Sequence, residues 1–309
     1  MLPQGGKLLH RLDRLVGALG TLDGDLRTHE LLSQHTTIRI GGPASCLFQP
    51  SSIEDFRQAV RLCQSSGVRW KVIGNGSNLL FSDSGFDGVI LSTRSLDRIE
   101  LECEGDELRA VRCACGVMLD RLIVETERVG CMSLGFLAGI PGTVGGAVTM
   151  NAGPRDLPIG HRVLAVEWID AQGNLQSADA DACRFGYRDS LFRSQDAIIT
   201  SVRLSCEGES YDREAILDDR RLRQPVDVPS AGCVFRNPVG DSAGRLIDRL
   251  GLKGLACGGA RVSEKHGNFI LNYSRATSAE IRMVIDILRQ KVYNGSHILL
   301  DLEIEVIDG

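Results

Sequence analysis

The stretch at residues 131–153, CMSLGFLAGIPGTVGGAVTMNAG, contains six glycines and no charged side chain. Its length alone would allow a transmembrane helix. Pro141, several hydroxyl side chains and Asn151 argue against one, because a lipid-facing helix needs unbroken backbone hydrogen bonding and large apolar side chains. We therefore expect no membrane span here, but a buried, glycine-rich segment that wraps round a ligand.

A second glycine-rich stretch, GNGSNLLFS at 74–82, follows the apolar run VRWKVIG. Successive backbone N–H groups without Cβ obstruction can form a concave site for phosphate oxygens. The pattern is not G-x-G-x-x-G, and residues 79–81 are strand-like, so a tight turn without a ligand is the alternative. Two such segments in one domain favour a long, flat, phosphorylated cofactor held by backbone donors.

The remaining apolar residues recur at helical spacing in some segments and as short runs in others, which predicts an α+β chain. The expected helices are 8–20, 53–67, 117–129, 242–252 and 278–292, the last with Ile281, Val284, Ile285, Leu288 and Val292 inward. The expected strands are 68–74, 86–92, 98–104, 108–114, 163–170, 196–206, 268–272 and 298–307. The polar run EGESYD at 207–212 marks a domain boundary, since 309 residues suit two domains.

Composition limits the class of protein. The formal net charge of −5 argues against a general nucleic-acid binder, which would show a basic excess. Ten cysteines without a C-x-x-C pair or a signal peptide are typical of reduced thiols in the cytoplasm. Cys113 and Cys115 would share one strand face, and without a neighbouring Cys/His cluster we expect no metal site.

The stretch SAGCVFRNP at 230–238 carries more polar chemistry than a packing cysteine needs. Small residues before Cys233 suggest a close approach to the backbone, and Arg236 and Asn237 follow it with a charge and an amide. From residue 184 to 249 every basic residue other than histidine is arginine, a side chain suited to bidentate binding of carboxylate and phosphate. Ordinary surface ion pairs are the alternative for most of these arginines.

A set of motifs occurs in one order from about Thr36 to Ile307: GNGSNLLFSDSGFDGVIL, FLAGIPGTVGGAVTMNAG, GYRDSLF, SAGCVFRNP, DSAGRLI, GLKG, ARVSEKHGNFI and a terminal acidic strand. Together they resemble the UDP-N-acetylenolpyruvoylglucosamine reductase family. The resemblance implies an N-terminal helical segment (1–35), an FAD-binding domain of the vanillyl-alcohol-oxidase (PCMH) type built from two subdomains (36–206), and a C-terminal α+β substrate-binding domain (213–309).

The same resemblance implies an activity. NADPH would reduce non-covalently bound FAD, and the flavin would then reduce UDP-N-acetylglucosamine enolpyruvate to UDP-N-acetylmuramate during peptidoglycan precursor synthesis. It also implies a cytoplasmic enzyme that acts as a monomer on small molecules, without nucleic acid or membrane.

The motif match places site residues by family position. The FAD diphosphate would contact Gly74, Asn75, Gly76, Ser77 and Asn78. The rest of the cofactor would lie along Ile140, Pro141, Gly142, Thr143, Gly145, Gly146 and Gly153. Substrate would contact Tyr187, Arg236 and Asn237, and the catalytic positions would be Arg188, Cys233 and Glu303.

Each catalytic residue type suits the implied chemistry. Hydride addition to an enol ether needs the neighbouring carboxylate to accept charge as an enolate, and Arg188 can stabilise it; a salt bridge to Asp189 or another carboxylate is the alternative. Cys233 can donate the proton to the α-carbon if it stays a thiol, and many relatives carry serine there. Pattern alone would make Glu303 solvent-facing, so only the resemblance assigns it to proton delivery.

The chain departs from the family pattern in two places. GPRDLPIGHR follows Asn151 in place of the commoner Ala-Tyr-Gly continuation. The segment between Phe192 and Ala197 is short, and in this the chain resembles the class that lacks an inserted tyrosine-bearing loop. Two other functions stay open. One is a flavin oxidase of the same cofactor fold, in which flavin is often linked to histidine; His161 and His266 are the nearest unexplained histidines. The other is a non-catalytic sensor of FAD or of a nucleotide sugar.

Overall fold

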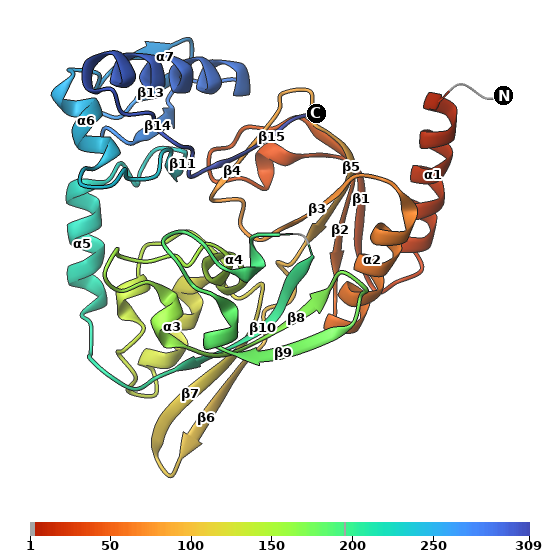
Figure 1. The fold of residues 1–309 in the computed structure, drawn as a ribbon. Helices are drawn as coiled ribbons and strands as arrows, with labels where there is room; N and C mark the ends of the chain where they lie inside the picture. The colour runs from red at the N-terminus through yellow and green to blue at the C-terminus, as the bar shows by residue number, and fades with distance from the viewer. Residues whose placement is uncertain (1–3, 195) are drawn as a thin grey trace. The chain divides into compact units, whose positions relative to one another are not determined.

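Four short strands make the first sheet of the computed structural model, which describes residues 4–194 and 196–309. Their order is β1 (Gly24–Leu31), β2 (Pro43–Pro50), β5 (Phe86–Ser92) and β3 (Trp70–Ile73). The helices α1 (Gln4–Leu19) and α2 (Ile53–Ser66) pack against each other beside this sheet (Figure 1). Ser52 caps the start of α2 by accepting the Asp55 N–H, and Gly67 ends the helix in a left-handed conformation with φ of 66°.

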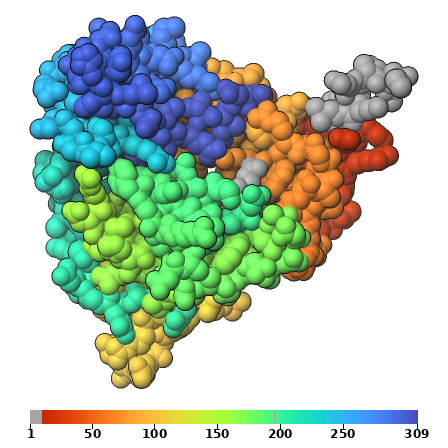
Figure 2. Space-filling view, in the orientation of Figure 1, coloured from red at the N-terminus to blue at the C-terminus, as the bar shows by residue number. Residues whose placement is uncertain are grey.

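A second sheet is antiparallel throughout and is longer. Its order is β6 (Ile99–Glu104), β7 (Glu107–Ala114), β10 (Ala197–Ser205), β8 (Val163–Asp170) and β9 (Leu175–Asp179). The β6–β7 hairpin extends beyond the other strands, and its yellow tip stands out from the surface in Figure 2. The helices α3 (Leu119–Glu127) and α4 (Val144–Thr149) follow β7 in the chain. Most residues of 131–149 are buried, as expected for the uncharged stretch.

The C-terminal part of the chain contains a third, smaller sheet. Its order is β11 (Ser230–Cys233), β14 (Phe269–Asn272), β13 (Ala260–Val262) and β12 (Ala256–Cys257). It is accompanied by α6 (Ala243–Arg249) and α7 (Ser278–Ser296). The predicted inward side chains of α7, from Ile281 to Val292, are all buried, and Thr277 and Glu280 form a capping box at its start. A separate parallel pair joins β4 (Leu79–Phe81) to β15 (Glu305–Ile307).

The chain divides into two compact units. Unit 1 contains residues up to His29, Ser45–Asn75 and Gly88–Leu217, and unit 2 contains Glu30–Ala44, Gly76–Asp87 and Asp218–Gly309. Each unit has its own buried apolar cluster. The division falls inside α5 (Arg213–Arg223), and two early segments join unit 2. The domain bounds expected from the sequence, 1–35, 36–206 and 213–309, stay a prediction.

The structure corrects the expected strand at 298–307. Only residues 305–307 form a strand, paired with β4, and the preceding residues make an isolated bridge between Phe235 and Leu302. The apolar alternation in 298–307 therefore reflects contacts with two different partners along its length. Strands β1, β2, β9, β11, β12 and β13 and helices α4 and α5 were not predicted. Within the described residues, no helix is long and apolar enough to cross a membrane.

Candidate functional site

The two glycine-rich stretches meet within unit 1. The Asn75 side-chain amide donates a 2.7 Å hydrogen bond to the Pro141 carbonyl oxygen. A Cβ atom at Gly74 would lie 2.4 Å from Thr143 Oγ1, so the contact requires glycine there. Residues 74–75 of the first stretch thus lie against residues 141–143 of the second.

The second stretch is attached to the end of β7. The backbone N–H groups of Val144 and Gly145 each donate a 2.8 Å bond, to the carbonyls of Val117 and Cys115. Thr143 caps α4 by accepting the Gly146 N–H at 3.3 Å. The N–H groups of Gly145 and Gly146 are thus hydrogen-bonded within the protein. This stretch can therefore contact a ligand through its surface, but these two N–H groups are not available as donors to it.

Two features of the described residues fit a phosphate-bearing, flat cofactor such as FAD. The backbone N–H groups of Gly76 and Ser77, within the first stretch, have no hydrogen-bond acceptor among the described residues. Gly146 is exposed, and a Cβ atom there would meet only Thr143 Oγ1, at an ordinary 3.4 Å. The first feature leaves donors for anionic oxygens, and the second leaves open surface for a ring system.

Arg188 lies in a tight turn of unit 1 that Asn151 holds in place. Asn151 is buried; its Nδ2 donates to the Gly186 carbonyl at 2.8 Å, and its Oδ1 accepts the Gly160 N–H at 2.9 Å. Arg188 itself has a positive φ of 53°, a conformation uncommon outside glycine. Such local strain persists only where the surroundings hold it, and it is common at functional sites.

The Arg188 side chain is anchored by backbone oxygens. Its Nη1 donates to the Gly153 carbonyl at 3.0 Å and lies 3.5 Å from the Asn151 carbonyl. The ring of Tyr187, 40% exposed, lies 5.4 Å from the Arg188 guanidinium carbon. The structure therefore gathers three of the predicted residues, Gly153, Tyr187 and Arg188, into one cluster of unit 1.

Cys233 ends β11 in unit 2, immediately after an irregularity in the strand. Cys233 pairs with Phe269 and Ser230 with Leu271, with a register shift between the two pairs. Gly232 occupies this shift with a φ of 77°. A bulge of this kind redirects the side chain that follows it, which gives the small residues before Cys233 a physical reason. The thiol-bearing residue is half-buried.

Glu303 lies on the neighbouring backbone segment of unit 2. Its N–H donates to the Val234 carbonyl at 2.8 Å, one residue beyond Cys233. Asn78 holds the other side of this segment, because its Nδ2 donates to the Glu303 carbonyl at 3.1 Å and its own carbonyl accepts the Glu305 N–H at 2.9 Å. Three predicted residues, Asn78, Cys233 and Glu303, are thus carried by directly bonded segments.

The predicted substrate residues after Cys233 also have structural bonds. The Arg236 N–H donates to the Asp301 carbonyl at 2.9 Å. Asn237 Oδ1 accepts the Ala243 N–H at 3.1 Å, at the first turn of α6. Arg236 is half-buried and Asn237 is exposed.

Two buried asparagines were missed as site residues by the sequence analysis. Asn151 and Asn268 both bond to backbone groups beside predicted catalytic residues. Both stand inside motifs that we quoted, MNAG and HGNFI, but nothing in the sequence distinguishes a buried asparagine that bonds to backbone from an exposed one.

All ten cysteines are free. Burial raises the pKa of Cys113 and of Cys115 to about 12, so both remain thiols that pack in the core. In the part of the chain that the structure describes, no group of three His, Cys, Asp or Glu side chains is placed to hold a metal ion.

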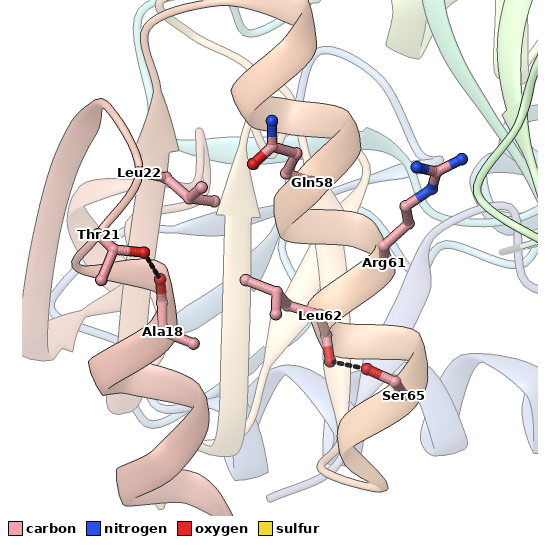
Figure 3. Close-up of a pocket in the computed structure, with 7 residues that line it drawn as sticks. All are labelled: Ala18, Thr21, Leu22, Gln58, Arg61, Leu62 and Ser65. Atoms are coloured by element: carbon pink, nitrogen blue, oxygen red, sulfur yellow. Dashed lines mark hydrogen bonds between the residues drawn. The ribbon is translucent and has the colours of Figure 1, made fainter.

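A surface groove of about 340 Å³ lies elsewhere in unit 1, between the end of α1 and α2 (Figure 3). Its hydroxyl groups bond to helix carbonyls, Thr21 to Ala18 and Ser65 to Leu62, and Arg61 donates to the Gly173 carbonyl at 2.9 Å. The polar groups that line it are thus used within the protein, and it contains none of the predicted site residues.

Comparison with known families defines the class. Residues 44–179 match the family described as FAD binding domain, which contains both β3 with residues 74–78 and the stretch 131–153. Together with the fold and the surface at Gly146, this makes the chain an FAD-binding flavoprotein with a mixed α+β architecture.

The relatives then define the family. Residues 224–307 match the C-terminal domain of UDP-N-acetylenolpyruvoylglucosamine reductase. The reductase of that name from Moorella thermoacetica is 40% identical over 96% of this chain and 98% of its own length, and that from Chlamydia pneumoniae is 41% identical over 89% of this chain. A crystal structure of the enzyme from Thermus caldophilus covers 93% of this chain with a TM-score of 0.76 at 33% identity. The chain belongs to the UDP-N-acetylenolpyruvoylglucosamine reductase family.

Proposed function

We propose that Arg188, Cys233 and Glu303 are the catalytic groups of the reductase reaction of this family. The chain is a flavin-dependent oxidoreductase that uses FAD and NADPH to reduce UDP-N-acetylglucosamine enolpyruvate to UDP-N-acetylmuramate in peptidoglycan precursor synthesis. The observation that best supports the assignment of residues is the direct backbone bond that joins the segments carrying Cys233 and Glu303.

Bound FAD would supply the redox chemistry that carries hydride between NADPH and the substrate. The residues that would hold it are those of 74–78, whose free N–H groups at Gly76 and Ser77 suit its diphosphate, and Pro141 and Gly146, whose surface is exposed. Asn75 and Thr143 would act by keeping the two stretches together.

Arg188 would stabilise the negative charge that develops on the substrate carboxylate. Its Nη1 is bonded to the Gly153 carbonyl, which fixes the orientation of the guanidinium, a planar group whose geometry suits the recognition of a carboxylate. A positive charge held in this way needs little reorganisation during the reaction.

Cys233 would donate the proton that completes the reduction. Its place after the bulge at Gly232 fixes where the thiol points, and the bond from Glu303 N–H to Val234 keeps the carboxyl-bearing residue on the adjacent segment. Glu303 would assist by orienting or replenishing that proton. We assign Tyr187, Arg236 and Asn237 to substrate binding; the exposed Tyr187 ring suits stacking, and Arg236 suits a diphosphate.

We further propose a monomeric, cytoplasmic enzyme of the class without the tyrosine-bearing loop. The short connection from Phe192, within the 3₁₀ turn Leu191–Arg193, to β10 supports the class; Gln195 within it lies outside the described residues. The ten free cysteines and the need for NADPH and a UDP-sugar support the compartment. Light scattering of the purified protein across a concentration series tests the monomer.

Separate measurement of the two half-reactions of Cys233 variants tests the assignment. Cys233→Ala should slow substrate-dependent reoxidation of the flavin by roughly 10²–10⁴-fold, the usual contribution of a positioned acid. Cys233→Ser should retain substantial activity, because a hydroxyl can still donate. Flavin reduction by NADPH needs no such acid and should be unchanged in both variants.

Stopped-flow absorbance gives both rates. Equal slowing of both half-reactions in Cys233→Ala would indicate a structural lesion, and slowing of neither would mean that Cys233 only packs. Bound flavin without NADPH consumption in the wild-type protein would favour a sensor over an enzyme.

A further inference from the structure

Asn268 is a buried side chain next to the predicted acid and has no assigned role. It is 2% exposed and lies directly before β14, the strand that pairs with β11. The β11–β14 ladder ends at the pair Cys233–Phe269. The residues after Cys233 therefore leave the sheet where Asn268 begins.

Asn268 continues the pairing with its side chain. Its Oδ1 accepts the Phe235 N–H at 2.9 Å, its Nδ2 donates to the Phe235 carbonyl at 2.7 Å, and its backbone carbonyl accepts the Val234 N–H at 2.9 Å. The carboxamide thus bonds to both backbone groups of one residue, as a peptide group of a neighbouring strand would. These bonds fix the two residues that follow Cys233.

The opposite edge of the same segment carries Glu303. The Val234 carbonyl accepts the Glu303 N–H at 2.8 Å, and Phe235 forms the isolated bridge with Leu302. Residues 234–235 therefore lie between Asn268 on one edge and the Glu303 segment on the other. A shift of residues 234–235 would move both Cys233 and Glu303.

We propose that Asn268 is a positioning residue that aligns Cys233 and Glu303 for proton delivery; this rests on the catalytic assignment above. The carboxamide is required because it supplies one donor and one acceptor. An ionised aspartate has no donor and would place negative charge against the Phe235 carbonyl. A misplacement near 1 Å can slow a reaction on the order of 100-fold.

Asn268→Asp tests this, with Asn272→Asp as its matched control. Asn272 ends the same strand, and its side chain also bonds to two backbone groups, donating to the Ile38 carbonyl at 3.0 Å and accepting the Ala276 N–H at 2.7 Å. Those groups do not belong to the segments that carry Cys233 or Glu303. Both variants lose one bond to a backbone carbonyl, so a general loss of stability should be similar in the two.

The expected results separate position from stability. In Asn268→Asp, substrate-dependent flavin reoxidation should slow on the order of 10- to 100-fold, while reduction by NADPH stays within about twofold. Amide hydrogen exchange, measured by mass spectrometry on the protein without substrate, should speed up in peptides covering 233–236 and 301–304. Asn272→Asp should leave both half-reactions within about threefold and leave exchange in these two peptides unchanged.

Three outcomes would decide against the proposal or its basis. If both half-reactions slow equally in Asn268→Asp, or if it behaves as Asn272→Asp, Asn268 is structural only. If Cys233→Ala has no effect on reoxidation, the catalytic assignment fails instead. If both assignments hold, adding Asn268→Asp to Cys233→Ala should slow reoxidation much less than it does in the wild-type protein. Should Asn268→Asp not fold, Asn268→Gln, which holds the same amide one methylene farther out, should show the same selective slowing to a smaller extent.

Discussion

The Arg188 turn of unit 1 and the Cys233–Glu303 region of unit 2 hold their functional groups in different ways. In unit 1 the side chain itself is anchored, because the Arg188 guanidinium donates to the Gly153 carbonyl. In unit 2 the backbone beside Cys233 is fixed, through the bonds of Val234 with Asn268 and with Glu303. A buried asparagine supports each region, Asn151 in the first and Asn268 in the second.

The difference follows from the length of the side chains. Arginine has many rotamers and loses considerable entropy when it is ordered, so its charged end needs a fixed acceptor of its own. Cysteine has one rotatable bond before its sulfur, so fixing the backbone nearly fixes the thiol. A short acid can therefore be aligned by strand-like pairing, whereas a long cation needs a strained turn with converging carbonyls.

The largest expected effect that would test this contrast is at Arg188. Arg188→Ala should slow substrate reduction by about 10²–10³-fold, as removal of a transition-state donor does, and Arg188→Lys by on the order of tenfold or more, because charge remains but the planar fork is lost. Single-turnover reoxidation of reduced enzyme measures both. Arg184→Lys, an exposed arginine of the same segment, is the control. Full activity of Arg188→Lys would assign Arg188 to structure.

A smaller effect should distinguish the two glycine-rich stretches. A Cβ atom at Gly76 would lie 2.1 Å from the His35 carbonyl oxygen, at a φ of 62°, so Gly76→Ala should destabilise the protein by about 1–3 kcal/mol. Gly146 lies in a helix with open space, so Gly146→Ala should leave the stability of the FAD-free protein unchanged or slightly higher.

Gly146→Ala should nevertheless weaken FAD binding by a few-fold, because the added methyl group occupies the proposed cofactor surface. Titration of the FAD-free protein with FAD, followed by flavin fluorescence, measures the change. Unaltered FAD affinity in Gly146→Ala would remove this residue from the cofactor site.

The smallest expected effect is a pH dependence within unit 2. Burial, and to a smaller extent the nearby charge of Lys253, lowers the pKa of His266 below its usual 6.5. The backbone N–H of Asn268 donates to His266 Nδ1 at 3.2 Å, and this nitrogen can accept the bond only while it is unprotonated. The unfolded chain therefore binds a proton more readily than the folded one. The contribution of His266 to the free energy of unfolding is therefore complete above pH 6.5 and decreases as the pH falls toward the folded-state pKa.

Urea unfolding at a series of pH values below and above 6.5 checks this sign. His266→Asn keeps an acceptor near the position of Nδ1 without titrating, so its stability should fall less steeply on acidification than that of the wild-type protein. An equal slope in both proteins would mean that His266 does not contribute to the pH dependence.

Local patterns along the chain predicted much of the fold. The periodicity of 278–292 gave the buried face of α7, and the apolar runs gave β3, β5 and β14. Missing from that prediction were β1, β2 and the pairing of β4 with β15, which join segments distant in the sequence. Short strands of this kind carry little periodic signal, because their burial depends on partners that lie far along the chain.

The sequence by itself determined the family, the order of the motifs and the type of chemistry. Glycine-rich runs, a thiol and an arginine at fixed positions are recognised from residue types and their order along the chain alone. Only the tertiary structure decided that Asn75 bonds to Pro141, that Asn151 supports the Arg188 turn, and that Asn268 and Glu303 bond to opposite edges of residues 234–235. An asparagine has the same letter whether it is solvated or bonded to backbone. Which of these it becomes depends on long-range packing, because a buried amide is stable only where the fold brings it both a donor and an acceptor.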